Sequence, residues 1–311
     1  MLEFQRLTKY YSSNAPAIDD LSFDVHDGEI VGFVGLNGAG KTTTIRIAAG
    51  VSLPTEGTVR VDGRDVVKEK AAASRSIGWV PEFPNVEPNA KALDLMLYFA
   101  GFHGITGGEA RRRSEELLST VRLGESEGKR IRTFSQGMKK RFSLALALLS
   151  DPKNLVFDEI LNGLDPEGIH YMRELTAELR KGGRAVLLSS HILAEIENLS
   201  DRVVFIHKGK IVESLTTEEL RSQGSAEGVL RVGIANLDEN ALSYLRSFGE
   251  TRVEVANTVA ITRFAGDPAS VNAELVSRGY AVKELSYQRS SLEDYFLKLV
   301  GVTGAGGDSQ Q

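Results

Sequence analysis

The amino-acid sequence predicts an α/β fold whose centre is a mainly parallel β-sheet. Three short apolar runs, at 30–34, 155–159 and 185–189, are typical of strands buried on both faces. Segments with helical periodicity lie between them, as expected for strands joined by crossover helices. Two alternating runs, 2–7 and 21–25, predict an antiparallel layer beside this sheet. At 311 residues the chain is long enough for about two domains.

The most informative motif lies at residues 35–42, directly after the first buried strand. Two glycines, Gly35 and Gly40, are followed by Lys41 and Thr42 in the pattern G-x-x-x-x-G-K-[ST]. Residues 43–49 have the pattern of the helix that should follow, so the motif has the strand–loop–helix context that it requires. The sequence therefore predicts a P-loop NTPase core.

This loop also predicts residues that bind a nucleotide. Glycine has no side chain, so backbone N–H groups can turn toward a β-phosphate, and the dipole of the next helix favours the same anion. We expect Lys41 to bridge the β- and γ-phosphates and the Thr42 hydroxyl to bind Mg²⁺. The predicted nucleotide contacts in the loop are Gly35, Asn37, Gly38, Ala39, Gly40, Lys41, Thr42 and Thr43.

The composition argues against several classes of protein. Hydrophobic residues make up 41% and charged residues 25%, as in an ordinary globular protein. The net charge of −5 gives no support to nucleic-acid binding, and the absence of cysteine excludes disulfides and thiolate metal sites. The amino terminus lacks the apolar segment of a signal peptide, and no apolar run approaches the roughly 20 residues of a membrane-spanning helix. We therefore expect a soluble protein that reaches a membrane only through a partner.

Two carboxylates, Asp158 and Glu159, end the second buried strand. Acidic residues at strand ends are often simple caps. Downstream of a P-loop, however, one carboxylate can hold Mg²⁺ through water and its neighbour can orient or deprotonate an attacking water. We assign the first role to Asp158 and the second to Glu159.

Two other polar features precede a helix or follow a strand. Ser135, Gln136 and Gly137 form a turn before a helix predicted at 142–149, so the turn is either a helix cap or an anion-binding helix start. His191 follows the strand 185–189. A lone histidine is usually structural, but the carboxyl end of a parallel strand is where ligands bind.

The intervening segments predict a helical subdomain and two tight turns. Amphipathic helices at 90–102 and 109–121 indicate a helical subdomain over about 84–150. The dipeptides Asp27-Gly28 and Asp62-Gly63 predict β-hairpins.

A second domain follows residue 221. Residues 222–227 have the composition of a linker, and 228–301 show the order β-α-β-β-α-β of a ferredoxin-like α+β domain. A glycine-rich tail, 302–311, is predicted to be disordered.

Taken together, these motifs resemble the ATP-binding subunit of ABC transporters over residues 1 to about 221. The resemblance rests on six motifs in the order of that family. They are the P-loop (35–42), Glu82 in the place of the Gln-loop glutamine, the signature (135–138), the Walker B strand (155–159), the D-loop (Leu164-Asp165) and the switch histidine (His191).

The resemblance implies roles for individual residues. It implies catalytic roles for Lys41, Glu159 and His191, and it makes Thr42, Glu82 and Asp158 metal ligands. It places Tyr11 where the family has an adenine-stacking aromatic, although such a tyrosine is also compatible with ordinary packing. The nucleotide contacts that it adds are Tyr11, Ser135, Gln136, Gly137 and Asp165.

The resemblance also implies a mechanism. Two ATPase subunits, expected as a homodimer, would bind head to tail, with each ATP between the P-loop of one and the signature of the other. The cofactors would be ATP and Mg²⁺, and the partner an integral membrane permease on the inner face of the cell membrane. Such a chain would be cytoplasmic and peripheral, and would power export of a drug, antibiotic, lipid or similar amphipathic compound.

The alternative is a soluble ABC ATPase without a permease, acting on ribosomes, DNA or cluster assembly. Ribosome-acting members usually carry two ATPase halves, and DNA-repair members insert a long coiled coil before the signature. This chain has one half, and only short helices separate Glu82 from Ser135. It also lacks the Asn-Lys-x-Asp motif of a GTP-dependent switch.

Three departures from the family pattern stand out. Gln136-Gly137-Met138 replaces the common Gly-Gly-Gln, Glu82 replaces glutamine, and Ile160-Leu161 replaces the frequent Pro-Thr. The first two, together with the Ser-Leu-Glu-Asp-Tyr-Phe sequence at 291–296, are similar to the drug- and antibiotic-exporter branch. That branch does not account for Ile160-Leu161, which bears on the geometry of Glu159.

Overall fold

The chain divides into two units, Met1–Ser214 and Leu215–Gln311. The computed structural model describes residues 1–12, 15–220, 228–254, 257–262, 264, 266–288 and 292–301. The predicted linker and the predicted tail lie outside these ranges, as does Ser291 of the carboxyl-terminal motif.

A six-stranded sheet in the order β10-β9-β3-β8-β7-β6 forms the centre of the first unit. Neighbouring strands from β9 to β6 are paired in parallel. Every residue of β3, β7 and β8 is buried, which explains why these strands are continuous apolar runs. The strands are β3 (Ile30–Val34), β6 (Ile77–Val80), β7 (Asn154–Asp158), β8 (Ala185–Ser190), β9 (Arg202–His207) and β10 (Lys210–Thr216). The predicted α/β class is confirmed.

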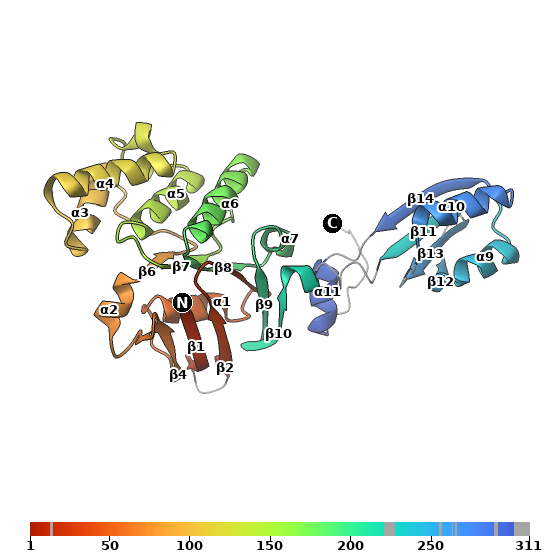
Figure 1. The fold of residues 1–311 in the computed structure, drawn as a ribbon, viewed down its shortest axis with the longest axis horizontal. Helices are drawn as coiled ribbons and strands as arrows, with labels where there is room; N and C mark the ends of the chain where they lie inside the picture. The colour runs from red at the N-terminus through yellow and green to blue at the C-terminus, as the bar shows by residue number, and fades with distance from the viewer. Residues whose placement is uncertain are drawn as a thin grey trace. The chain divides into compact units, whose positions relative to one another are not determined.

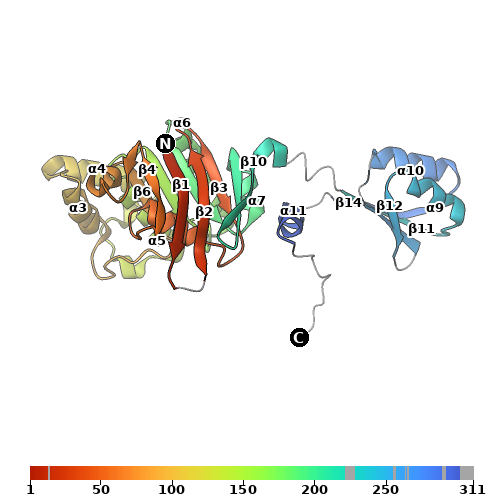
Figure 2. The ribbon, with the colours of Figure 1, turned by 90° about the horizontal axis from the view of Figure 1, so that it is seen from below.

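An antiparallel sheet in the order β2-β1-β4-β5 forms a second layer, in which β1 and β2 run side by side (Figure 2). Its strands are β1 (Leu2–Tyr10), β2 (Pro16–Val25), β4 (Glu56–Val61) and β5 (Arg64–Asp65). Asp62 and Gly63 have positive φ and join β4 to β5, so the hairpin predicted there is confirmed.

The hairpin predicted at Asp27-Gly28 is wrong. These residues lie between β2 and β3, which belong to different sheets. The turn therefore carries the chain from the antiparallel layer into the parallel sheet.

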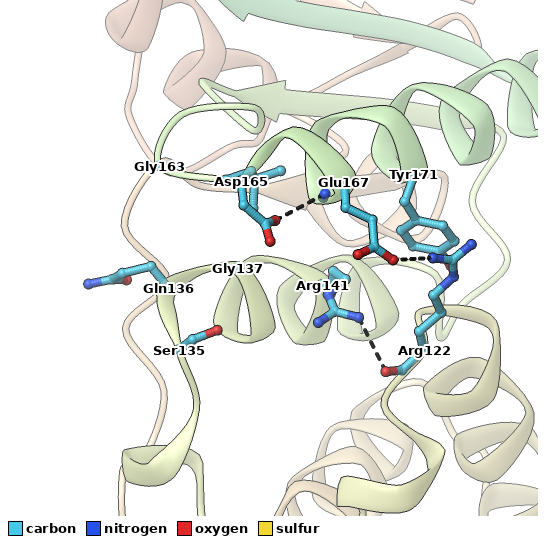
Figure 3. A pocket seen from close by; sticks show the side chains of 11 residues that line it. Arg122, Ser135, Gln136, Gly137, Arg141, Gly163, Asp165, Glu167 and Tyr171 are labelled. Atoms are coloured by element: carbon cyan, nitrogen blue, oxygen red, sulfur yellow. Dashed lines mark hydrogen bonds and ion pairs between the residues drawn. The ribbon is translucent and has the colours of Figure 1, made fainter.

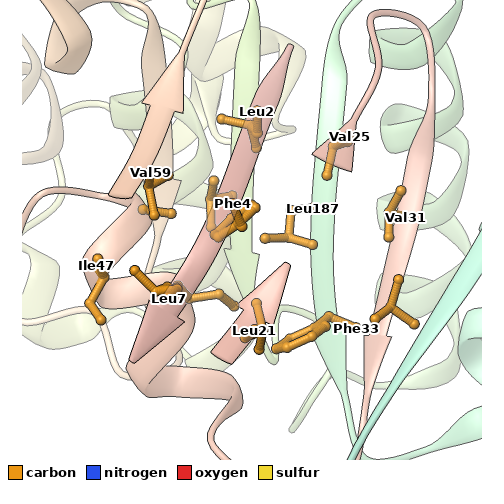
Figure 4. Close-up of a cluster of buried hydrophobic side chains, with 14 of the residues drawn as sticks. Leu2, Phe4, Leu7, Leu21, Val25, Val31, Phe33, Ile47, Val59 and Leu187 are labelled. Atoms are coloured by element: carbon orange, nitrogen blue, oxygen red, sulfur yellow. The ribbon is translucent and has the colours of Figure 1, made fainter. Parts of the chain in front are cut away.

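Buried apolar side chains from both sheets make one core (Figure 4). Phe23 stacks on Phe4 and on Phe33, with ring centroids 4.1 and 5.2 Å apart. Helix α1 (Lys41–Ala48) contacts β4 of one sheet and β7 of the other, and its Ile45 and Ile47 are buried in this core. The core thus fixes the strand before the P-loop and the helix after it.

Helices α3, α4 and α5 gather away from the antiparallel layer, on the side of the parallel sheet where β6 and β7 lie (Figure 1). Within the described ranges, every helix is too short or too polar to traverse a bilayer. The helices of this unit include α2 (Lys70–Arg75), α3 (Ala92–Phe102), α4 (Gly107–Thr120), α5 (Gln136–Ala147), α6 (Pro166–Lys181) and α7 (Leu193–Glu197), with 3₁₀ turns at Gly124–Ser126 and Ile131–Thr133.

The second unit has an antiparallel sheet in the order β12-β13-β11-β14. Two helices interrupt the strands so that the chain order is β-α-β-β-α-β, as predicted for a ferredoxin-like domain. The elements are β11 (Val229–Ile234), α9 (Glu239–Arg246), β12 (Glu250–Val253), β13 (Thr258–Thr262), α10 (Pro268–Ser277) and β14 (Val282–Gln288), followed by α11 (Leu292–Leu299).

Candidate active site

The loop between β3 and α1 has the backbone conformation that its glycines allow. Gly38 and Gly40 have φ of 79° and 114°, in the left-handed region that favours glycine. A side chain at Gly40 would also lie 2.7 Å from the Ala17 carbonyl oxygen. The capping residue of α1 is Gly40, which has no side chain to accept a hydrogen bond from the first N–H groups of the helix. An anion bound in the loop could accept hydrogen bonds from these N–H groups instead.

Lys41 is the first residue of α1 and is only 6% exposed. Its Nζ donates to the carbonyl oxygens of Gly35 (2.7 Å) and Leu36 (3.3 Å) and lies 3.5 Å from Glu159 Oε1. The ammonium is thus held between the phosphate-binding backbone and a carboxylate at the end of β7. A nucleotide β- or γ-phosphate could replace the loop carbonyls as its partner.

Asp158 is the last residue of β7 and is 2% exposed. Its Oδ1 accepts from Ser189 Oγ (2.8 Å) and Thr42 Oγ1 (3.3 Å). Burial raises the pKa of Asp158, and these two hydrogen bonds oppose that rise. A bound cation would favour its carboxylate form.

Glu82 adds a second carboxylate to the same region. Burial, followed by the nearby Asp158 and Glu159 carboxylates, raises the pKa of Glu82. In the described ranges, no group of three or more His, Cys, Asp or Glu residues is arranged to hold a metal alone. Oxygen donors from Thr42, Asp158 and Glu82 nevertheless suit Mg²⁺, which usually takes one or two carboxylates together with phosphate oxygens and water.

Glu159 follows β7 in a left-handed conformation, with φ of 50°. Its backbone N–H donates to Ser189 Oγ (3.0 Å). Its Oε2 lies 3.0 Å from His191 Nδ1 and accepts from Asn162 Nδ2 at 3.1 Å. The carboxylate is therefore held in one orientation by Asn162 of its own turn and by His191, which follows β8.

Most of these groups, although not Asp158 or Ser189, line one cavity of about 250 Å³. The structure brings the P-loop, Glu82, Glu159 and His191 together there, as the sequence predicts for a site of hydrolysis. The cavity is lined by Ala17, Asn37, Gly38, Gly40, Lys41, Thr42, Thr43, Glu82, Glu159, Asn162 and His191.

Asn162 and Ser189 were not among the predicted site residues, whereas the predicted residues Tyr11, Gly35, Ala39 and Asp158 are not part of the lining. Asn162 donates to the Glu159 carboxylate, and Ser189 donates to the Asp158 carboxylate and accepts from the backbone N–H of Glu159. The one signal in the sequence was the position of Ser189 at the end of a buried strand. Tyr11 is 63% exposed, with Lys9 Nζ 5.1 Å from its ring centroid, and does not line the cavity.

The signature residues line a different cavity, of about 390 Å³ (Figure 3). Ser135 caps α5 by accepting from Met138 N (3.2 Å), so the cap interpretation is confirmed. Asp165 caps α6 by accepting from Gly168 N (3.0 Å). The cavity is lined by Arg122, Ser135, Gln136, Gly137, Arg141, Gly163, Leu164, Asp165, Glu167, Gly168 and Tyr171. This cavity includes neither Asp158 nor Glu159, so the predicted nucleotide contacts fall into two separate places on one chain.

Comparison with known proteins agrees with this geometry. Residues 18–162 match the ABC transporter family. The chain is 36% identical over 296 residues to the bacitracin transport ATP-binding protein BcrA of Bacillus licheniformis, covering 95% of each protein. It is 34% identical to Nod factor export ATP-binding protein I of Burkholderia thailandensis, covering 96% of this chain and 97% of that protein. A solved structure of an ATP-binding subunit of an ABC transporter shares 32% identity and a TM-score of 0.66, over 72% of this chain and 92% of that one.

The chain belongs to the ABC transporter family. It is an ATP-binding subunit, and its activity is ATP hydrolysis coupled to transport.

The structure also shows where the departures from the ABC pattern lie. Glu82 lines the P-loop cavity, and Gln136 is exposed at the first position of α5 and lines the signature cavity. Ile160 and Leu161 lie within the turn that begins at Glu159, and both are buried. With these residues in place, Glu159 still lies beside Lys41 and His191.

Proposed function

We propose that two copies of this chain bind two ATP molecules between them and use their hydrolysis to drive an integral membrane permease. One observation supports a shared site above all. Ser135 and Gly137 line a cavity separate from the one that holds Lys41 and Glu159, so a nucleotide on the P-loop needs a second copy to supply the signature. The copies would form a homodimer, peripheral on the inner face of the cell membrane.

In this proposal each residue has a defined chemical role. Lys41 and the P-loop N–H groups bind the phosphates, and Glu159 orients or deprotonates the attacking water. His191 holds the Glu159 carboxylate and contacts the γ-phosphate. Mg²⁺, held by Thr42 and Asp158 with Glu82 beside it, would neutralise charge on the transferred phosphoryl group.

Export of an amphipathic compound is the transport reaction that we propose. Relatives that match along nearly the whole chain are named for bacitracin transport, linearmycin resistance and Nod factor export. This similarity includes the second unit, which the family match at 18–162 does not reach. A permease-free role on ribosomes or DNA has no such support.

A mixing experiment tests the shared site. Ser135→Arg would block the signature that a chain offers to its partner, and Lys41→Ala would disable the chain's own P-loop. We expect each variant alone to be inactive in ATP hydrolysis and a mixture of the two to recover part of the activity. Only the mixed dimer retains one intact site, with the P-loop of one chain and the signature of the other. If no activity returns in mixtures shown to contain mixed dimers, the shared-site proposal is wrong.

The permease would dock on an apolar surface beside Glu82. Phe83 is 78% exposed. Tyr98 and Phe102 on α3 are also exposed, and the centroids of these two rings are 5.1 Å apart. A groove of about 300 Å³ adjoins these residues and is lined in part by Val86 and Phe99. Such exposed aromatic clusters are typical of protein–protein interaction sites.

Phe83→Ala tests this docking surface. We expect the variant to bind tens-fold more weakly to membrane vesicles that contain the permease, because an interface aromatic is worth about 2 kcal/mol or more. ATP hydrolysis by the free subunit should stay nearly normal. Leu53→Ala is a matched control, since Leu53 is also exposed but is far in sequence from the groove, whereas Phe83 directly precedes the lining residue Pro84. Unchanged vesicle binding by Phe83→Ala would rule out this surface.

A further inference from the structure

Lys140 is a buried ammonium that the proposed chemistry does not use. It lies on α5, in the second turn after the signature serine, and is 5% exposed. Its Nζ donates to two backbone carbonyl oxygens, those of Glu159 and Asn162, each at 2.5 Å. A buried ammonium is costly unless it is hydrogen-bonded, so these two bonds define where it sits.

The two carbonyls that Lys140 binds are the two ends of one tight turn. Asn162 N donates to Glu159 O (3.2 Å), which closes the turn 159–162. Glu159 starts the turn with φ of 50°, a conformation that is uncommon for a residue other than glycine. Such a conformation persists only where the surroundings hold it. The lysine therefore fixes both ends of a turn that is strained at its first residue.

The first and last side chains of this turn face the P-loop cavity. Glu159 and Asn162 both line it, and Asn162 Nδ2 donates to Glu159 Oε2 at 3.1 Å. Burial lowers the pKa of Lys140, and the Glu82 and Glu159 carboxylates oppose that effect. Because Lys140 binds the carbonyl oxygens of Glu159 and Asn162, movement of its ammonium would move both the catalytic carboxylate and the amide that orients it.

We propose that Lys140 is a positioning residue for ATP hydrolysis, which holds the Glu159 turn of its own chain in the reactive geometry. Helix α5 carries Ser135 at its start and Lys140 within it, so one helix joins the signature offered to the partner to the catalytic turn of its own site. The inference rests on the shared-site function proposed above. It adds that Lys140 acts on the ATP of its own P-loop, whereas Ser135 acts on the ATP of the partner's.

The test places Lys140→Met in one or the other chain of the mixed dimer. In the Ser135→Arg chain, which supplies the working P-loop and Glu159, we expect kcat to fall by about 10- to 100-fold, the effect of a small displacement of a catalytic group. KM for ATP should change less than about two-fold, because the phosphate-binding groups are intact. In the Lys41→Ala chain, which supplies only Ser135, the same substitution should change kcat less than about two-fold. Lys140→Arg in the first chain should restore much of kcat.

Equal losses in both placements, or no loss in the first, would overturn the proposal. Lys139→Met is the matched control, because it removes a neighbouring charge on the same helix that is not bound to the turn, and it should leave kcat unchanged. If Lys140→Met does not fold, Lys140→Gln keeps a donor without the charge and should show a smaller loss in the same chain only. If the parent mixture itself is inactive, the shared site fails instead. The role of Lys140 is then tested in protein made of identical chains that differ from the parent only at residue 140. A kcat loss with Lys140→Met that is absent with Lys140→Arg supports the role, and an unchanged kcat refutes it.

Discussion

Replacing Glu159 with glutamine should lower ATP turnover by roughly 10²- to 10⁴-fold while leaving ATP affinity nearly unchanged, because a general base contributes about that much to the rate. The substitution keeps the shape of the side chain. It also keeps a group that can bond to Asn162 and His191, which hold the carboxylate at 3.1 and 3.0 Å. Phosphate release gives the turnover, and titration with a fluorescent ATP analogue gives the affinity.

Glu56→Gln is the control for this experiment. Glu56 is an exposed carboxylate on β4 and lines neither cavity, so its substitution should change neither quantity. A Glu159→Gln variant that turns over ATP at the normal rate would show that another group activates the water.

The second large effect is expected from Lys41→Ala, which should reduce hydrolysis by at least about 10³-fold and also weaken ATP binding. The lysine is buried beside Glu159, and its ammonium would make charge-assisted contacts to the β- and γ-phosphates that nothing else in the cavity can replace. Phosphate release and nucleotide titration again measure the two quantities.

Lys68→Ala controls for the loss of one positive charge, since Lys68 is exposed and lies outside both cavities. Near-normal turnover in purified Lys41→Ala would contradict the assignment of residues 35–42 as the phosphate-binding loop.

Local patterns were sufficient to predict the elements that carry the site. β3 has the predicted bounds, and β7 and β8 differ from prediction by a single residue at their ends. These strands are buried on both faces, so their apolar character does not depend on a particular neighbour. The conformation of Gly40 agrees with the motif, because a glycine there can adopt the left-handed backbone that the structure shows.

Contacts between distant segments could not be read from the sequence. A dipeptide such as Asp27-Gly28 indicates a turn but not whether the next strand stays in the same sheet, which is decided by long-range packing. Ser189 and Lys140 acquire their roles only because β8 and α5 pack beside the end of β7. No spacing along the chain encodes those hydrogen bonds.

The central claim is that ATP joins two copies of this chain, and the mass of Glu159→Gln in solution tests it most directly. A variant that binds ATP but cannot cleave it should accumulate the closed pair. By size-exclusion chromatography with light scattering, we predict the mass of two chains with ATP and of one chain with ADP. Adding Ser135→Arg to the same chain should prevent the pairing. The mass of a single chain at saturating ATP, with ATP binding verified, would contradict the account.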